Sequence, residues 1–146
     1  TRLLIQTDGG TYTASGAGNE SKGIKVAPAL AFDGDYGSAW YHDNHSSGWL
    51  KIDFGLGNSE TVTILMFKAA HTSWPGAGIN KFRFEGSNDD STWTPLLSSE
   101  AKNIFSFQEF PLQNENAYRF YRISIIDSHA QHIGISEVTF AESAHK

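Results

Sequence analysis

AFDGDYGSAW, residues 31–40, is the stretch that decides the fold of this chain, and residues 48–55, GWLKIDFG, extend the argument. The second segment alternates apolar and polar residues and closes on a glycine, which is typical of a strand that runs into a turn. The first segment holds an Asp-Gly-Asp turn followed by a serine. Such a turn gathers the oxygen atoms that a hard cation such as calcium requires. Trp40, at the end of the turn, is predicted to fill the core beneath it.

The rest of the chain also divides into short alternating stretches separated by turns. The cleanest is KFRFE at residues 81–85, where phenylalanines and charged residues alternate strictly. Aromatic residues make up 13% of the 146 residues and charged residues 18%, with 14 glycines, a composition that favours strands and turns. Eight or nine short strands at regular spacing, without sustained helical periodicity, predict an all-β sandwich or barrel. No linker interrupts it, so we expect residues 1–146 to form a single domain.

Charge and cysteine content exclude several classes of function. The formal net charge is −5, and no Lys/Arg cluster exists to neutralise phosphates, which disfavours nucleic acid and anionic lipid as partners. No apolar run approaches the roughly 20 residues of a membrane span. Without cysteine there can be no disulfide framework, thiol catalysis or zinc–thiolate site. The chain begins with neither Met nor a signal peptide, so we expect an excised domain or a mature product.

Four further motifs accompany the first two in a fixed order along the chain. They are TYTAS at 11–15, FEGSNDDSTW at 84–93, YRFYRI at 118–123 and ISEV at 135–138. The ordered set resembles the discoidin family, also called the coagulation factor five/eight C-type domain, with the carbohydrate-binding modules that share its fold. The resemblance covers nearly the whole chain. It implies an eight-stranded antiparallel jelly-roll β-sandwich that binds a ligand and does not catalyse.

The resemblance also implies a structural Ca²⁺ ion at the first motif. Its shell would combine side-chain oxygens of three residues, Asp33, Ser38 and Glu137, with the backbone carbonyls of three others, Leu30, Asp35 and Ser136. Six ligands lie within the range that calcium takes. Because Glu137 is about a hundred residues from Asp33, the ion would join the first loop to the last strand. The alternative is an ordinary Asp-Gly turn in which Asp33 bonds its own backbone.

In sugar-binding members of the family the ligand lies on loops at one edge of the sandwich. Sugar recognition needs an aromatic face for the C–H patch of the ring and polar groups around it for the hydroxyls. Three segments, 41–47, 70–80 and 127–132, carry such residues and each follows a predicted strand. The predicted ligand-binding residues are Tyr41, His42, His45, His71, Trp74, Arg83 and His129.

Each of these residues also has a plain structural interpretation. Trp40, Trp49 and Trp93 fall in family motifs and are predicted to be core, whereas Trp74 lies in a Ser/Pro/Gly loop as a stacking platform or an apolar plug. Arg83 could present a fork to sugar oxygens, or form a surface salt bridge with Glu85 or with a neighbouring strand. Arg119 and Arg122 are predicted to be structural. Two histidine pairs, His42/His45 and His129/His132, leave a zinc site as an alternative, although no HExxH helix supports it.

No arrangement of residues predicts catalysis. The chain lacks a Gly-x-Ser-x-Gly elbow, and no nucleophile accompanies Asp127 and His129. We therefore expect a non-catalytic carbohydrate-binding module from a larger secreted enzyme, extracellular or at the cell surface. Galactose-type sugars are implied by the resemblance alone. The alternative is an adhesion or receptor-binding domain of a lectin or of a viral or phage tail. Membrane insertion ranks last, and the oligomeric state stays open.

Overall fold

A computed structural model describes residues 2–3, 11–16, 28–32, 39–42, 45–69, 78–102, 104, 106–129 and 132–142. Within these ranges the chain forms ten strands and one short 3₁₀ helix. They are β1 (Arg2–Leu3), β2 (Thr11–Ala14), η2 (Pro28–Ala31), β3 (Trp40–His42), β4 (Gly48–Asp53), β5 (Ile64–Ala69), β6 (Lys81–Ser87), β7 (Thr94–Glu100), β8 (Gln108–Pro111), β9 (Phe120–Ile125) and β10 (Ile133–Glu142). No helix among the described residues is long and apolar enough to cross a membrane.

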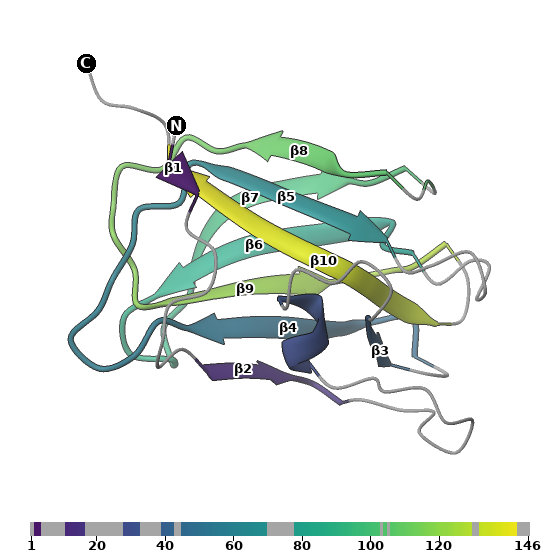
Figure 1. Ribbon diagram of the computed structural model, residues 1–146, viewed down its shortest axis with the longest axis horizontal. Helices are drawn as coiled ribbons and strands as arrows, with labels where there is room; N and C mark the ends of the chain where they lie inside the picture. The colour runs from purple at the N-terminus through teal and green to yellow at the C-terminus, as the bar shows by residue number, and fades with distance from the viewer. Residues whose placement is uncertain are drawn as a thin grey trace.

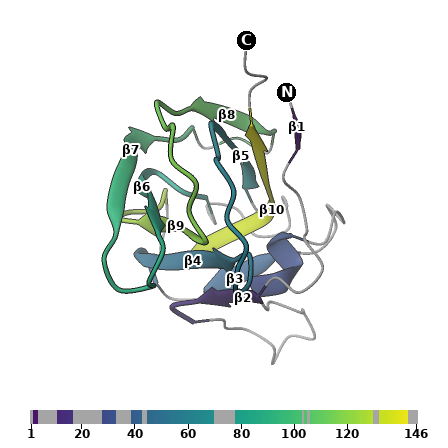
Figure 2. The same ribbon diagram turned by 90° about the vertical axis from the view of Figure 1, so that its left-hand side faces the viewer.

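The strands form two antiparallel sheets, which Figures 1 and 2 show as two facing layers. The first sheet, sheet A, has the order β1-β10-β5-β8, with β3 also paired to β10. The second, sheet B, has the order β2-β4-β9-β6-β7. The predicted all-β antiparallel sandwich is therefore confirmed. The described residues contain ten strands where eight were expected, and β1 and β3 are the shortest, with two and three residues.

Alternation along β4 and the first half of β6 places one side of each strand in the core. Leu50 and Ile52 of β4 are each 1% exposed, and Phe84 of β6 is fully buried. Phe84 stacks on Tyr121 of β9, with ring centroids 5.4 Å apart. Trp40 is also fully buried, as predicted, and its indole nitrogen donates a hydrogen bond of 2.8 Å to the carbonyl of Gly16. Burial of these large rings supplies most of the driving force for closing the sandwich.

Trp49 and Trp93 were predicted to be core, and this prediction is wrong. Both are only partly buried. Trp49 alternates with Leu50 and Ile52, so it faces out of sheet B, where the Lys51 ammonium lies 5.2 Å from its ring. The guanidinium of Arg122 lies 4.0 Å from the ring of Trp93. The alternation in GWLKID already predicts that Trp49 faces outward, because Trp49 lies on the same face of the strand as Lys51 and on the opposite face from Leu50.

Four strand connections leave the sandwich at the same end. Pairing of Gly48 with Ile125 joins the start of β4 to the end of β9, and pairing of Lys81 with Glu100 joins the start of β6 to the end of β7. In sheet A, Ile133 at the start of β10 pairs with His42 at the end of β3. The connections β3–β4, β5–β6, β7–β8 and β9–β10 therefore meet at one end of the strands, which we call the loop end.

Replacing Tyr121 with phenylalanine is expected to lower the free energy of unfolding by about 1–3 kcal/mol. Its hydroxyl donates 2.6 Å to the carbonyl of Glu60 and accepts from the buried amide of Val62 at 3.1 Å. Phenylalanine keeps the ring but leaves that amide without its acceptor. Burial also raises the pKa of Tyr121 to about 12, so the hydroxyl stays protonated. Urea unfolding of the two proteins measures the effect, and equal midpoints would contradict it.

Candidate functional site

Backbone hydrogen bonds hold three connections of the loop end together. The amide of Ala101 donates 2.7 Å to the carbonyl of Asn80, and the amide of Asn80 donates 3.0 Å to the carbonyl of Asp127. The amide of His129 donates 3.0 Å to the carbonyl of Gly78, beside an isolated bridge between Ile79 and Ser128. Residues 78–80 and 127–129, the described parts of two predicted ligand loops, are thus joined to each other and to the β7–β8 connection.

His42 lies in a narrow space between two glycines. A Cβ on Gly16 would lie 2.5 Å from Nε2 of His42, and one on Gly48 would lie 3.3 Å from its Nδ1. The imidazole is 9% exposed, and its Nδ1 lies 3.4 Å from Oγ of Ser15. The predicted loop residue is therefore the last residue of β3, fixed between two strand ends. Only a residue without a side chain allows the backbone to approach the ring so closely.

His42 and His45 form a stacked pair at the edge of this space. Their ring centroids lie 3.8 Å apart with an interplanar angle of 16°, and His45 is exposed. In parallel rings the in-plane nitrogen lone pairs do not converge on one point, so this arrangement is a poor two-ligand zinc site. Burial first, and the neighbouring His45 second, lower the pKa of His42. The buried imidazole is therefore held in its neutral form, able to donate and accept one hydrogen bond each.

The lowered pKa of His42 predicts a loss of stability on mild acidification. Above the ordinary histidine pKa of about 6.5 both the folded and unfolded chains carry a neutral ring. As the pH falls from there toward the folded pKa, only the unfolded chain takes up the proton, so the free energy of unfolding decreases. His42→Gln should reduce this loss between pH 7 and pH 5 in urea titrations. His45→Gln should reduce it in part, and an unchanged pH slope in both variants would contradict the account.

The other predicted ligand residues fall in different places. Tyr41 is 4% exposed, so its ring offers little open surface for stacking. His129 is exposed, but its Nε2 lies 2.9 Å from the carbonyl of Ala101 and fixes the loop. Arg83 lies on the outer face of sheet B, while His42 belongs to sheet A, so the structure does not bring these two together. His71 and Trp74 lie outside the described residues.

Arg83 and Glu85 do not form the ion pair that the sequence left open as one alternative for Arg83. That carboxylate instead accepts from Arg122 of β9, with Nη2 at 3.0 Å and Nε at 3.2 Å. Arg122 and Glu85 are cross-strand neighbours, whereas Glu85 is two positions along the same strand from Arg83. Arg119 makes a fork to Asp53 with distances of 2.7 and 2.9 Å. Both arginines predicted to be structural therefore form ion pairs within the sheet.

Half of the proposed calcium shell lies among the described residues. Glu137 is 2% exposed and Ser136 is fully buried, while Leu30 is half-buried in η2. β10 contains a bulge, in which two residue steps along β10, from Ile135 to Glu137, lie opposite a single residue step along β5. The extra residue, Ser136, is left out of the ladder, which is how a bulge frees a carbonyl and redirects a side chain. Burial first, and the charge of Glu137 second, raise the pKa of the Tyr12 hydroxyl.

Both ends of segment 33–38 are anchored on either side of Glu137. Phe32 stacks on Tyr12 with centroids 4.5 Å apart and lies 6.2 Å from the ring of Phe140 on β10. After the segment, Trp40 pairs with Ile135 of the same strand. Asp33, Asp35 and Ser38 themselves lie outside the described residues. Among those that are described, no three His, Asp or Glu side chains gather closely enough to hold a metal.

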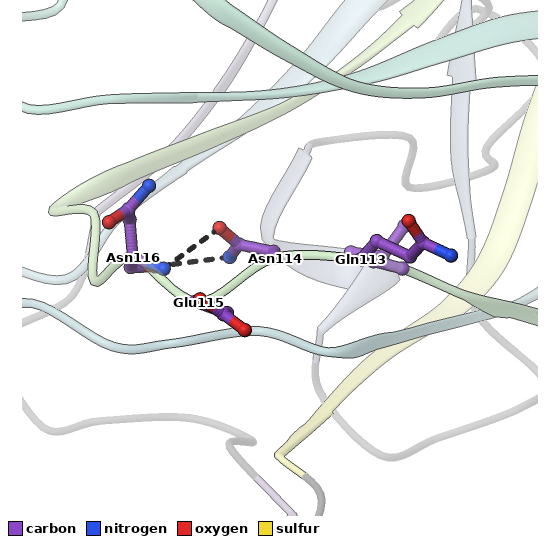
Figure 3. A pocket seen from close by; sticks show the side chains of 5 residues that line it. Gln113, Asn114, Glu115 and Asn116 are labelled. Carbon is purple, nitrogen blue, oxygen red and sulfur yellow. Dashed lines mark hydrogen bonds between the residues drawn. The ribbon is translucent and has the colours of Figure 1, made fainter.

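A shallow pocket of about 510 Å³ lies at the opposite end of the sandwich, in the β8–β9 connection. Five residues line it: Leu112, Gln113, Asn114, Glu115 and Asn116. Figure 3 shows the Asn114 amide turned toward Asn116, to which it is joined by two hydrogen bonds of 3.0 and 3.1 Å. The buried amide also donates 3.0 Å to the carbonyl of Val62. This lining offers no aromatic face, and its buried polar group serves the loop itself, which disfavours it as a sugar site.

Comparison with known proteins identifies the family. The model of the F5/8 type C domain matches residues 11–138, most of the chain. The chain therefore belongs to the F5/8 type C, or discoidin, domain family. No curated protein sequence matches it significantly.

Solved structures with the same fold include two carbohydrate-binding modules from Clostridium perfringens. The module CpGH89CBM32-5, in complex with GalNAc-β-1,3-galactose, has a TM-score of 0.80 at 12% identity, covering 91% of this chain and 95% of that one. The family 32 module of NanJ, in complex with galactose, has a TM-score of 0.80 at 15% identity, covering 97% and 98%. A GH29 fucosidase from Ruminococcus gnavus, in complex with fucose, matches with a TM-score of 0.77 at 22% identity, covering 97% of this chain but 27% of that one. At these identities the likeness shows the fold.

Proposed function

We propose that this domain is a non-catalytic carbohydrate-binding module that holds its glycan at the loop end. The observation that supports this most strongly is membership of the F5/8 type C family together with a fold shared with modules solved in sugar complexes. The junction of residues 78–80 with 127–129 would supply a fixed base for such a site. A rigid frame lowers the ordering cost of binding, which matters because exposed sugar hydrogen bonds yield little net energy.

The histidines and Trp74 provide the chemistry of the proposed site. Trp74 would stack on the C–H face of a pyranose, and the 41–47 segment would supply hydrogen bonds through His42 and His45. His71 and His129 lie in the two joined loops and would complete the ring of donors. Terminal galactose and N-acetylgalactosamine are the proposed ligands, because structures of this fold contain galactose and GalNAc-β-1,3-galactose. A neutral imidazole can both donate to and accept from sugar hydroxyls.

A structural calcium ion is the second part of the proposal. Glu137 is a carboxylate that is 2% exposed, and Ser136 beside it is the bulge residue left out of the β10–β5 ladder. These two features fit an oxygen shell completed by Leu30, Asp33, Asp35 and Ser38. The ion would neutralise the buried carboxylate and join the segment after η2 to β10. Its role would be to hold the scaffold, since the proposed ligands leave no position for chemistry.

The likeness to part of a larger fucosidase supports a place for this domain beside a catalytic domain. A module there keeps the enzyme close to its glycan, which raises the local concentration of substrate without any catalytic residue of its own. We propose an extracellular setting on the same ground, because glycans of this kind lie outside cells. The parent activity belongs to the rest of such a protein.

A glycan array with the isolated domain tests the proposal. We expect calcium-loaded protein to be retained by terminal galactose and N-acetylgalactosamine and released by free galactose. Titration calorimetry of the best glycan should give a micromolar to millimolar dissociation constant, because a few exposed contacts provide only modest affinity. A folded, calcium-loaded domain that binds no glycan on the array would reject the proposed function.

A further inference from the structure

The outer face of sheet B carries a row of cations, most of which are already paired. Lys51 lies 2.8 Å from Asp90, and Arg119 and Arg122 form the ion pairs with Asp53 and Glu85 described above. Aromatic rings lie beside the same cations, with Arg122 4.0 Å from Trp93 and Arg119 4.7 Å from Phe120. Because these cations already form ion pairs within the protein, they are less available to bind a charged ligand.

Lys81 and Arg83 differ from the other cations of this face. Both are exposed on β6, alternating with the buried Phe82 and Phe84, so both point out of the sheet. Within the described residues neither makes an ion pair. Arg83 lies between Ser98 of β7 and Ser124 of β9, two short hydroxyl side chains, and Lys81 lies opposite Glu100. Glu100 is the one carboxylate in the lining of the pocket beside these two cations, and the carboxylate of Asp127, which follows Ile126, accepts from the Asn80 amide at 3.5 Å.

A pocket of about 330 Å³ opens beside these side chains. It is lined by Lys81, Phe82, Ser98, Ser99, Glu100 and Ile126. Ile126 is 49% exposed, one of the few large apolar side chains on the described surface. The pocket thus combines an aliphatic patch, two hydroxyls, a cation and a carboxylate, and Arg83 is the cross-strand neighbour of the lining residue Ser98. An apolar patch surrounded by hydrogen-bonding groups is what the two faces of a sugar ring require.

We propose that this pocket is a second glycan subsite, and that it takes a sugar bearing a carboxylate, such as a uronic acid residue. The carboxylate would accept from the guanidinium fork of Arg83 and from Lys81, which provides charge-assisted hydrogen bonds. Ser98 would contact ring hydroxyls and Ile126 the C–H face. The inference goes beyond the neutral-sugar site at the loop end and rests on the proposed function that the domain binds glycans.

The subsite adjoins the loop end, so one oligosaccharide can reach both. Ile126 directly precedes Asp127, whose carbonyl accepts from the amides of Asn80 and Lys81 at 3.0 and 3.2 Å. The backbone that closes the loop junction therefore also forms the rim of the pocket. A chain with a neutral terminal sugar in the loop site could place an acidic residue between Arg83 and Ile126.

Calorimetry with two oligosaccharides of equal length, an oligogalacturonate and its neutral, fully methyl-esterified form, tests the subsite. They share ring configuration and differ in the carboxylate. At low salt, Arg83→Gln is expected to weaken oligogalacturonate binding about tenfold, the effect of one charged hydrogen bond, and to leave the neutral chain unaffected. Glu100→Gln should act in the opposite direction and strengthen oligogalacturonate binding, because it removes a negative charge that repels the carboxylate of the sugar. Raising the salt concentration should reduce the preference of the domain for the acidic over the neutral oligosaccharide.

Lys102→Gln is the matched control, since it removes one exposed positive charge on the far side of Glu100. If Lys102→Gln weakens oligogalacturonate as much as Arg83→Gln does, the attraction is a general charge effect and the subsite is rejected. Equal affinity of the unchanged domain for both oligosaccharides would also reject the subsite. In that case, binding of the neutral oligosaccharide would still support the proposed function. Absence of binding to every glycan would instead reject the proposed function itself.

Discussion

Trp74→Ala is expected to abolish glycan binding, with the dissociation constant raised beyond measurement in calorimetry. Loss of a central tryptophan anchor typically removes about 2 kcal/mol or more from binding, here from an interaction that is weak to begin with. The free energy of unfolding should change by less than about 1 kcal/mol, as for other exposed substitutions. Trp74 lies in a Pro/Gly loop without alternating apolar neighbours, so no strand pattern buries it.

Two variants control this experiment. Trp74→Phe keeps an aromatic face and should retain part of the affinity. Leu56→Ala changes a side chain that is 88% exposed in the β4–β5 turn, at the other end of the strands, and should leave binding intact. If Trp74→Ala unfolds the domain, Trp74 is a core plug, and the stacking residue must be sought in the 127–132 segment.

Removal of calcium with EDTA is expected to lower the melting temperature by about 5–10 °C. An ion at a hundred times its dissociation constant stabilises the folded state by about 2.7 kcal/mol, and each kcal/mol shifts a domain of this size by about 2–4 °C. In the proposed shell, the carboxylates of Glu137 and Asp33 would repel each other without the ion. Asp33→Ala in calcium should reproduce the effect of EDTA.

Glu115→Gln provides the control for charge, because Glu115 is an exposed carboxylate at the opposite end of the strands. It should melt as the unchanged domain does and respond equally to EDTA. Melting curves of the unchanged domain that superimpose in EDTA and in millimolar calcium would remove the ion from the account. The glycan site would then stand on the loop junction alone.

The local sequence pattern was enough to predict the sandwich fold, but it predicted only part of the candidate site. Period-two alternation in KFRFE correctly placed Phe82 and Phe84 in the core and Arg83 outside. The same rule applied to GWLKID turns Trp49 outward, whereas its place in a family motif favours the core. A family motif shows that a residue type recurs at a position, whereas the alternation of residues along the strand shows which face of the sheet that residue occupies.

The details of the site depend on contacts between distant segments, which no local pattern carries. The space for His42 exists because Gly16 and Gly48, 32 residues apart, approach it from two sides. The partner of Glu85 is Arg122 on a strand 37 positions away, not the adjacent Arg83. The bulge at Ser136 likewise becomes visible only when β10 is aligned with β5. Long-range pairing decides these features, and a single sequence does not specify it.

The most direct test of the central claim is an amide NMR titration of the calcium-loaded domain with galactose. If the loop end binds the sugar, shift changes should cluster in residues 41–47, 70–80 and 127–132. Residues 112–116, around the pocket at the opposite end, should not respond. Shift changes confined to 112–116, or a domain that retains galactose without any response in the three loops, would contradict the account.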